Sequence, residues 1–556
     1  MSDETPKYRI IYHEVGHALQ YMDFPITPEN MLRKAVLPLA RTQVDCLSWL
    51  GHTYLGGPYD MPRMWRDYLD PSPYEYIDAQ GRPMGLFMEK IRPGHDLYHD
   101  EGQRRRYGTV HELWKQGADV VDLAAECARA RGMDFYLAFR LNDFHHGTWE
   151  EHPRWWLDHK EMTVGKGEGL EVGNHATRPL ASLDFTYPEV HEHMMAPMLA
   201  GAACYDVDGV EIDFTRCPPY FPTGQEQPEL LTAFLRELRT RLAPIFAEKG
   251  RPVRIMAHVP HPGACADIGL NWAAWMREGL VDHLASGGWQ FNGYHNDLRP
   301  LVAAARDAST RVYVAYDSIN YDYNHTARYG RIEYLRAACL NYYHQGVDGV
   351  LFFNDSGHWL KVYPGPAAAA YPHLLEVGDP DCIERRDKIY ALGWGCVEDW
   401  HLVWSSDKPD ERTGVEMTFQ VSDALQESAN CGDLERVRLR MAFQLRTPWI
   451  NELNAWHSIW SRLDRVEFLL NGEPIVPQAV ARDAVVTNPT TGEEVYRNWT
   501  RHMTFELTYG PLPRYGMNAL TVRMLEPDPQ LTGPRELWLG PVEVEVRYVK
   551  PGDYLG

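Results

Sequence analysis

VDGVEIDFTRCPPYF, residues 207–221, alternates apolar and acidic side chains along its first half. The alternation predicts a β-strand that carries Glu211 and Asp213 on one face and apolar residues on the other. Two prolines follow, and they end the strand because proline cannot continue a hydrogen-bonded ladder. Two carboxylates on an otherwise buried strand are costly unless they do chemistry. We therefore expect Glu211 and Asp213 to be functional, against the alternative of an edge strand whose polar face is solvated.

Strand-like runs recur along the first two thirds of the chain and alternate with helical stretches. The predicted strands cover residues 9–12, 44–49, 134–142, 210–214, 253–259, 281–284, 312–316 and 347–353. The predicted helices include residues 110–133, 188–205, 228–249, 271–279 and 331–343. Eight strands that alternate with helices are typical of a (β/α)8 barrel with insertions. The expected fold class is therefore α/β, with a catalytic TIM barrel over residues 1–378.

The pattern changes after residue 378, where helical periodicity gives way to short alternating runs. These runs cover residues 437–445, 465–470, 503–507, 519–524 and 542–549, and Asn471-Gly472 after the second of them is a hairpin signal. Such a pattern is typical of antiparallel strands packed as a sandwich. We expect a β-sandwich accessory domain over residues 379–556.

Composition and net charge indicate which classes of binding partner the chain can have. The 556 residues carry a formal net charge of −22, which argues against nucleic acid or an anionic membrane as a partner. The 18 Trp and 31 Tyr residues are a weak indication of a sugar-binding cleft, because aromatic faces stack on sugar rings. The expected partner is a carbohydrate substrate, no cofactor or metal is expected, and a homo-oligomer stays open.

The cysteines and the amino terminus bear on location. Nine cysteines are scattered without a CxxC pair, which is typical of reduced thiols and not of a disulfide framework. No basic-then-apolar leader opens the sequence, and no apolar run is long enough to span a membrane. We expect a cytoplasmic protein, or a secreted one if a signal peptide has been removed.

A barrel places the residues at the carboxyl ends of its strands around one mouth. By this rule the following residues converge: Asp143, His145, Glu211, Asp213, His258, Asp317, Asn354 and Asp355. Glycoside hydrolysis needs paired carboxylates, one protonated to assist the leaving oxygen and one ionised to attack or to activate water. Repulsion between near carboxylates separates their pKa values and allows that division. An aspartate after a strand can also simply cap the next helix, so the prediction depends on the convergence.

Residues 183–218 resemble the core signature of the family-10-like glycoside hydrolase barrels of bacteria. The residues that carry the resemblance are Pro188-Glu189-Val190, Tyr205, Val207-Asp208-Gly209, Asp213 and Pro218. Further along, Trp275 with residues 278–282 and residues 347–354 are similar to later elements of the same group. The resemblance covers about residues 130 to 355 and implies a (β/α)8 glycosidase in which Asp213 is a catalytic carboxylate.

Two departures from that family pattern affect the second catalytic group. The arginine expected after Pro-Glu-Val is His191, and the acid expected on the seventh strand is Asp317 instead of a glutamate. Two candidates therefore stand for the partner of Asp213: Asp317, which the resemblance implies, and Glu211, which geometry alone favours.

His13-Glu14-Val15-Gly16-His17 matches HExxH, the pattern of zinc metallopeptidases. On a helix the two histidines would share one face and bind Zn²⁺, with Glu14 as general base. The preceding run is strand-like, however, and no third ligand stands out downstream. The alternative is a first barrel strand and its loop, which would bring His13, Glu14 or His17 to the substrate site.

The remaining candidates are predicted to contact substrate: Glu14, His17, His52, Arg140, Asn142, Asp143, His145, Arg216, His258, Trp289 and Asn354. Arg140 and Arg216 offer bidentate donors to an acidic sugar, or else they orient Asp143 and Asp213 as ion pairs. Trp149, Trp155, Trp156 and Trp289 either form aromatic platforms or pack the long loops.

The sequence thus favours a glycoside hydrolase with Asp213 as one catalytic carboxylate and Glu211 or Asp317 as the other. The alternatives are a zinc peptidase, a non-catalytic carbohydrate-binding barrel, and a lyase or isomerase on the same fold.

Overall fold

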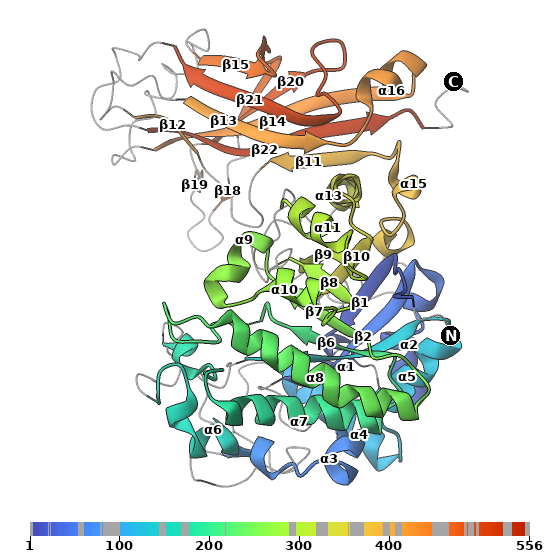
Figure 1. Ribbon diagram of the computed structural model, residues 1–556. Helices are drawn as coiled ribbons and strands as arrows, with labels where there is room; N and C mark the ends of the chain where they lie inside the picture. The colour runs from blue at the N-terminus through green and yellow to red at the C-terminus, as the bar shows by residue number, and fades with distance from the viewer. Residues whose placement is uncertain are drawn as a thin grey trace. The chain divides into compact units, whose positions relative to one another are not determined.

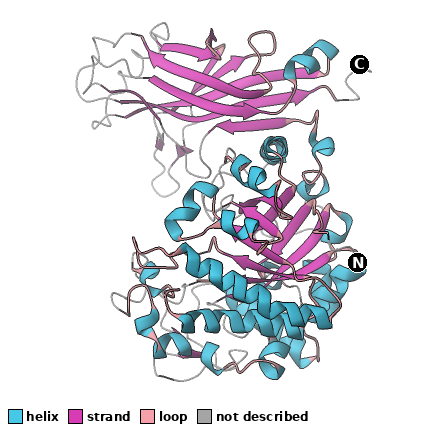
Figure 2. Cartoon of the chain, in the orientation of Figure 1, coloured by secondary structure: helices cyan, strands magenta, loops and turns pink. Residues whose placement is uncertain are grey.

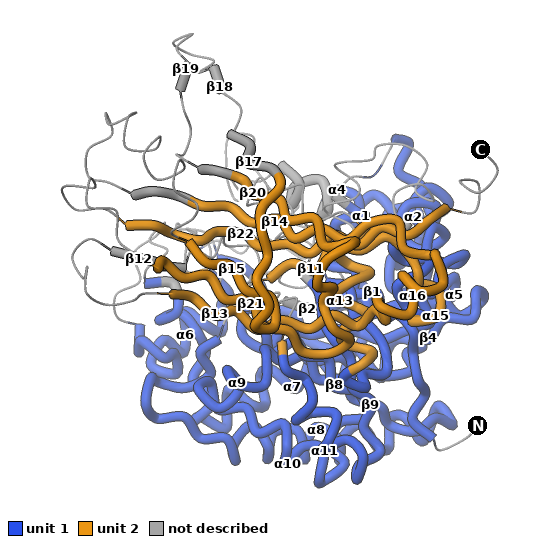
Figure 3. Tube along the Cα trace, turned by 90° about the horizontal axis from the view of Figure 1, so that it is seen from above, with its two compact units in different colours: residues 1–292, 297–323, 345–379 blue, residues 293–296, 324–344, 380–556 orange. Residues whose placement is uncertain are grey.

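The computed structural model describes the following residues: 4–20, 22, 24–53, 61–77, 81, 101–143, 152–167, 177–216, 218–287, 296–317, 332–353, 355, 372–392, 401–405, 414–446, 466–482, 486–487, 494–495, 500–525 and 536–550. The chain divides into two compact units, coloured separately in Figure 3. The first comprises residues 1–292, 297–323 and 345–379, and the second comprises residues 293–296, 324–344 and 380–556. The proposed boundary near residue 378 stays a prediction.

Eight parallel strands in the first unit close into a barrel (Figure 1). In chain order they are β1 (Ile10–Glu14), β2 (Val44–Thr53), β4 (Asp134–Arg140), β6 (Gly209–Asp213), β7 (Ile255–Val259), β8 (His283–Ser286), β9 (Arg311–Asp317) and β10 (Gly349–Phe353). Each strand pairs with the next, and β10 returns to β1. The predicted TIM barrel is confirmed, and the strand that opened the sequence analysis is β6.

Helices separate the barrel strands along the chain (Figure 2). The longer ones are α2 (Pro28–Ala35), α4 (Glu101–Lys115), α5 (Val120–Ala130), α7 (Pro188–Cys204), α8 (Pro228–Glu248) and α13 (Ile332–Gln345). The shorter ones are α1 (His17–Gln20), α3 (Pro62–Asp67), α6 (Arg154–Asp158), α9 (Pro262–Cys265), α10 (Trp272–Arg277) and α11 (Arg299–Ala305). Local chemistry sets several starts: Asp119 accepts hydrogen bonds from the backbone of α5, and α7 and α8 both begin at proline.

The floor of the barrel is filled by aromatic side chains at the amino-terminal ends of the strands. The hydroxyl of Tyr8 donates to Asp134 Oδ2 at 2.5 Å, and the imidazole of His283 stacks on the Tyr8 ring with centroids 5.0 Å apart. Gly209, the glycine of the VDG motif, makes room for this packing, because a Cβ there would lie 2.3 Å from the Tyr136 ring. The glycine is therefore required by close packing at the base of β6.

His283 makes the barrel floor sensitive to acid. Its side chain is fully buried, and within the described part of the chain neither ring nitrogen has a hydrogen-bond partner. Burial, assisted by the positive charges of Arg254 and Arg311, lowers the pKa of His283 to about 3. Between pH 6.5 and pH 3 the unfolded chain therefore binds a proton that the folded chain does not, so stability falls as the pH falls.

We expect His283→Phe to reduce this acid sensitivity. The wild type loses about 1.4 kcal/mol of unfolding free energy through this group for each pH unit below 6.5, and the variant lacks that loss. Thermal unfolding at pH 7 and pH 5 measures it: the drop in Tm between the two pH values is smaller for the variant. Equal drops in both proteins would contradict the assignment of the acid sensitivity to His283.

The second unit is built mainly from two antiparallel sheets. One sheet is ordered β11 (Lys388–Leu392), β22 (Glu536–Tyr548), β14 (Leu434–Arg446), β20 (Thr500–Glu506) and β17 (Ala479–Arg482), with β12 (His401–Ser405) also paired to β22. The other is ordered β13 (Gly414–Val421), β21 (Gly516–Met524), β15 (Val466–Leu470) and β16 (Glu473–Pro474). One buried apolar cluster takes side chains from both sheets, among them Phe419, Leu520, Leu439 and Val544. The predicted β-rich second part is confirmed.

Smaller elements complete the described chain. They are the paired strands β3 (Tyr76–Ile77) and β5 (His152–Pro153), the pair β18 (Val486–Thr487) and β19 (Glu494–Val495), and the helices α15 (Pro380–Ile383) and α16 (Leu425–Cys431). Single 3-10 turns lie at Leu39–Arg41, Ser72–Tyr74, Lys160–Met162, Arg178–Ala181, Ala266–Ile268 and Pro372–Leu375.

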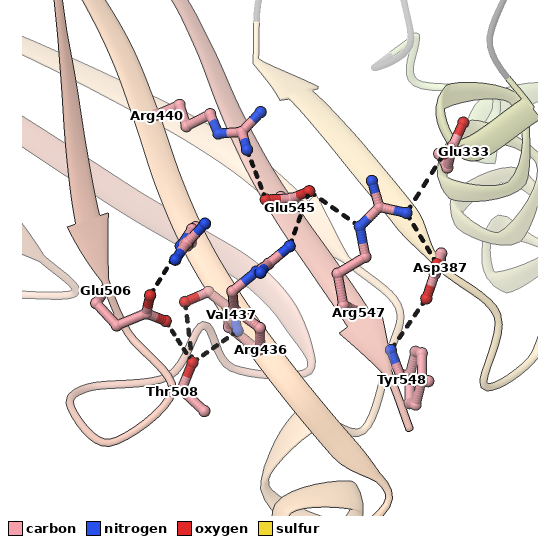
Figure 4. Close-up of polar contacts among 11 residues, drawn as sticks. Glu333, Asp387, Arg436, Val437, Arg440, Glu506, Thr508, Glu545, Arg547 and Tyr548 are labelled. Atoms are coloured by element: carbon pink, nitrogen blue, oxygen red, sulfur yellow. Dashed lines mark hydrogen bonds and ion pairs between the residues drawn. The ribbon is translucent and has the colours of Figure 1, made fainter. Parts of the chain in front are cut away.

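Helix α13 lies between β9 and β10 in the sequence but groups with the second unit. Its Ala337 belongs to the same apolar cluster as the two sheets. Its Glu333 contacts Arg547 of β22, which also binds Asp387 at 2.8 Å (Figure 4). Sequence order does not predict that α13 packs with the second unit, because the helix lies between two consecutive barrel strands like any other barrel helix.

Candidate active site

The carboxyl end of β6 carries the two carboxylates that the sequence singled out. Asp213 is paired in register with Arg140 of β4 on one side and with His258 of β7 on the other. The side chains of Glu211 and Asp213 are both fully buried. Because alternate residues of a barrel strand point inward, Glu211 and Asp213 occupy successive levels of the barrel interior.

Asp213 is held by hydrogen bonds from the two residues Thr215 and Arg216, which follow β6, and by the guanidinium of Arg140. Its Oδ1 accepts hydrogen bonds from Thr215 N at 2.9 Å, Thr215 Oγ1 at 2.7 Å and Arg216 N at 3.2 Å. Its Oδ2 lies 3.4 Å from Nε of Arg140. Burial alone would raise the pKa of Asp213, but His258, Arg140 and His13 with the Thr215 hydroxyl lower it by more. The carboxylate is therefore ionised at neutral pH.

Glu211 uses both of its oxygens within the barrel. Its Oε1 lies 2.8 Å from Nδ1 of His13 on β1, and its Oε2 accepts a short hydrogen bond from the hydroxyl of Ser48 on β2. His13 and Ser48 are themselves fully buried neighbours in the β1–β2 register. Glu211 therefore fixes the His13 ring, a contact that the sequence did not predict.

His258 stands between the two carboxylates. Its Nε2 lies 3.1 Å from the carbonyl oxygen of Gly287, to which it can donate a hydrogen bond. Its Nδ1 lies 3.8 Å from Asp213 Oδ1 and 3.9 Å from Glu211 Oε1. Burial lowers the pKa of His258 and outweighs the two carboxylates, which raise it. A proton that reached Nδ1 would lie between two negative charges.

Phe353, the last residue of β10, supplies the apolar contact common to these groups. The rings of His13 and His258 meet the Phe353 ring edge-on, with centroids 5.1 Å and 5.5 Å away. The Arg140 guanidinium lies over the face of the same ring at 5.5 Å. We call the two carboxylates of β6 and the three polar residues that contact Phe353 the carboxylate cluster: His13, Arg140, Glu211, Asp213 and His258.

Other predicted site residues are occupied by contacts outside this cluster. Glu14 Oε1 accepts hydrogen bonds from Gly16 N and Ala18 N and so caps the start of α1, which begins at His17. The Asn142 amide donates to Pro219 O and Leu183 O and accepts from Leu183 N. These contacts brace backbone, and the substrate-binding roles of Glu14 and Asn142 stay predictions.

The predicted ion pairs are seen for Arg140. Arg140 donates to Asp143 Oδ2 at 3.2 Å as well as facing Asp213, and its side chain is almost wholly buried. Arg216 contributes its backbone N–H to Asp213. Of the two roles predicted for Arg140, the contacts are those of an arginine that orients Asp143 and Asp213.

Several predicted site residues lie outside what the structure describes. These are His145, Trp289 and Asn354, together with the side chains of His52 and Asp317, whose backbones end β2 and β9. Their predicted roles stay predictions. Asp355 is described, and its Oδ2 lies 3.0 Å from Nε2 of His373.

The HExxH pattern does not form a zinc-binding helix. His13 and Glu14 belong to β1, Gly16 turns the chain with a φ of 90°, and His17 begins α1. The two histidines therefore do not share a helical face as a metallopeptidase requires. Among the described residues, no group of three or more His, Cys, Asp or Glu side chains could hold a metal ion, and no helix could cross a membrane.

Two of the tryptophans pack instead of forming platforms. Trp156 is almost fully buried and donates from Nε1 to Ala181 O at 3.0 Å. The Trp155 ring stacks on both His193 and His159, with centroids 4.2 Å and 4.4 Å away. For these two residues the packing alternative holds, whereas Trp149 and Trp289 lie outside the described residues.

No protein-family model matches the chain, and no curated protein matches it. Among solved structures, the chain is similar to a cycloisomaltooligosaccharide glucanotransferase of Paenibacillus sp. with 10% identity and a TM-score of 0.31, over 96% of this chain and 57% of that one. The chain thus spans less than two thirds of that protein.

It is also similar to the PgaB (BpsB) glycoside hydrolase domain from Bordetella bronchiseptica, with 12% identity and a TM-score of 0.34, over 66% of this chain and 99% of that one. A family GH18 chitinase from Chromobacterium violaceum is similar with 10% identity and a TM-score of 0.36, over 99% of this chain and 92% of that one. Likeness this weak does not transfer an activity, and we therefore rest the function on the residues of this chain.

Proposed function

We propose that the chain is a glycoside hydrolase whose reaction takes place at the carboxylate cluster. The observation that carries the proposal is Asp213: a buried, ionised carboxylate at the carboxyl end of a barrel strand, with one oxygen held by three donors. Glycoside hydrolysis passes through a transition state with positive charge on the sugar ring, and a fixed carboxylate in a dry site stabilises such charge strongly. Asp213 then attacks the anomeric carbon or activates water.

The other residues of the cluster hold Asp213 in that state. Arg140 faces Asp213 Oδ2 at 3.4 Å and is itself braced by Asp143. Fixed donors around a carboxylate keep it oriented at no cost during the reaction, which is the basis of electrostatic preorganisation. The family-10-like relationship and the division into a catalytic barrel and an accessory β-sandwich are part of this proposal.

Hydrolysis of a panel of oligosaccharides and aryl glycosides tests the function. We expect at least one substrate to release reducing sugar or aglycone at a rate proportional to enzyme concentration. The Asp213→Asn variant serves as the control for contaminating hydrolases, because a contaminant would be unaffected by the change. If no glycoside is cleaved, or if both proteins cleave equally, the proposal is wrong.

A further inference from the structure

The source of the proton that a leaving oxygen needs is the open question in the carboxylate cluster. Asp213 is ionised and so has no proton to give. Glu211 has both oxygens engaged, one by His13 and one by Ser48. Asp143 is paired with Arg140. Among the described residues at the site, none of these carboxyl groups is placed as a free general acid.

His13 has the geometry of a proton donor. Its Nδ1 lies 2.8 Å from Glu211 Oε1, so the ring is oriented by a carboxylate behind it. Its Nε2 has no hydrogen-bond partner within the described part of the chain, although the side chain is fully buried. An imidazole with one nitrogen fixed by a carboxylate and the other not engaged in a hydrogen bond is the arrangement that general acid–base catalysis uses.

We propose that His13, oriented by Glu211, gives the proton to the leaving oxygen, with Asp213 as the ionised carboxylate. This inference deepens the proposed function and rests on it. His13 is the catalytic residue, because its Nε2 would touch the reacting oxygen. Glu211 and Ser48 are positioning residues that act through the His13 ring.

The proposed step balances. In the imidazolium form of His13, Nδ1–H is donated to Glu211 and Nε2–H faces the substrate. The proton on Nε2 passes to the bridging oxygen as its bond to the anomeric carbon breaks, and the electron pair of that bond stays on the oxygen. Asp213 meets the positive charge that develops on the sugar. One water then adds to the anomeric carbon, and a proton of that water restores the imidazolium.

Among the described residues, the titratable side chains that interact with His13 are Glu211 and Asp213 of β6 and His258 of β7. Arg140 of β4 packs on the same Phe353 ring as His13. From the two strands adjacent to β1, Ser48 and Phe353 contribute neutral side chains. Glu211 is the nearest of these charged groups, so it is the group that orients the His13 ring.

The leaving group of the substrate provides the test. Glycosides with a sugar or alkyl leaving group need a proton, whereas a dinitrophenolate leaves without one. We expect His13→Asn, whose side-chain amide can still donate to Glu211, to lower kcat about a thousandfold on a sugar leaving group and less than tenfold on a dinitrophenyl glycoside. The control is His344→Asn, an exposed histidine on α13 before the amino-terminal end of β10.

The Glu211→Gln variant separates positioning from a merely structural role. A neutral amide orients the imidazolium less well than a carboxylate does, so kcat should fall more on a sugar leaving group, which needs the proton, than on a dinitrophenyl glycoside, which does not. Circular dichroism and thermal unfolding confirm that each variant is folded. A folded variant that keeps full activity, or that loses activity equally on both leaving groups, would show that Glu211 does not act through His13.

Each outcome bears on a definite claim. If His13→Asn loses activity equally on both leaving groups, or loses none, His13 is not the proton donor while the proposed function stands. If the wild type cleaves no glycoside of either kind, the proposed function is wrong and the assignment of His13 falls with it.

Discussion

Replacing Asp213 by asparagine should lower kcat/KM at least about a thousandfold, a loss of ~4 kcal/mol of transition-state stabilisation. Asparagine has almost the same shape, and its amide oxygen can still accept the hydrogen bonds from Thr215 and Arg216. What it lacks is the negative charge, in a buried site where charge is poorly screened and therefore most effective. Steady-state kinetics on the substrate found in the panel measure the effect.

Asp282→Asn is the matched control for Asp213→Asn. Asp282 is also an aspartate held by arginine and backbone donors: it binds Arg239 at 2.9 Å and accepts from Ile255 N at 2.7 Å. It precedes β8, at the opposite end of the barrel from the carboxylate cluster. We expect this variant to lose some stability and to keep its activity. An Asp213→Asn enzyme with more than a tenth of wild-type kcat/KM would refute the catalytic role of Asp213.

A chain cut after residue 379 should fail to give a stable barrel. The cut removes partners that α13 has beyond residue 379: Tyr334 donates to Glu543 at 2.5 Å, Arg336 to the Asp387 carbonyl at 3.1 Å and Asn341 to the Gln420 carbonyl at 3.0 Å. It also uncovers Ala337, which is buried in the cluster shared with the sheets. Each lost hydrogen bond costs about 1 kcal/mol of unfolding free energy, and the lost burial of apolar surface adds to this. The total is a large part of the unfolding free energy of a typical domain.

Expression of residues 1–379 beside the full chain measures this effect. We expect the short chain to be insoluble, or soluble without a cooperative thermal transition. In the full chain, Tyr334→Phe should cost about 1–3 kcal/mol because Glu543 is buried and loses a donor. Tyr515→Phe is its control, since Tyr515 contacts His344 of the same helix but is 60% exposed. A soluble short chain that melts cooperatively would contradict the prediction.

The strand positions and the carboxylate pair could be predicted because their signals are local. The alternation in β6, with Gly209 before it and the prolines after it, is a pattern of neighbouring residues, and the fixed topology of a barrel then brings the strand ends together. The same logic placed Arg140 and His258 near Asp213, as the register of β4, β6 and β7 bears out.

The contact between His13 and Glu211 could not be predicted from local sequence patterns. Its motif matched HExxH, and the same letters could be read as a helix or as a strand followed by a turn. A helix would have placed His13 and His17 together, whereas the strand places His13 beside Ser48 and across the barrel from Glu211, 198 residues away in the chain. The inward alternation of β1 was the signal that could have favoured His13 over Glu14.

The sequence by itself determined the barrel, the β-rich second part and the position of Asp213 at the carboxyl end of a barrel strand, because hydrophobic periodicity and the carboxyl-end rule follow from the chain's own order. Only the tertiary structure decided that Glu211 holds His13, that Asn142 braces backbone and that α13 packs with the second unit. These contacts join residues far apart in the chain. They depend on which side chains reach across the barrel interior or onto a distant sheet, and sequence spacing does not encode that.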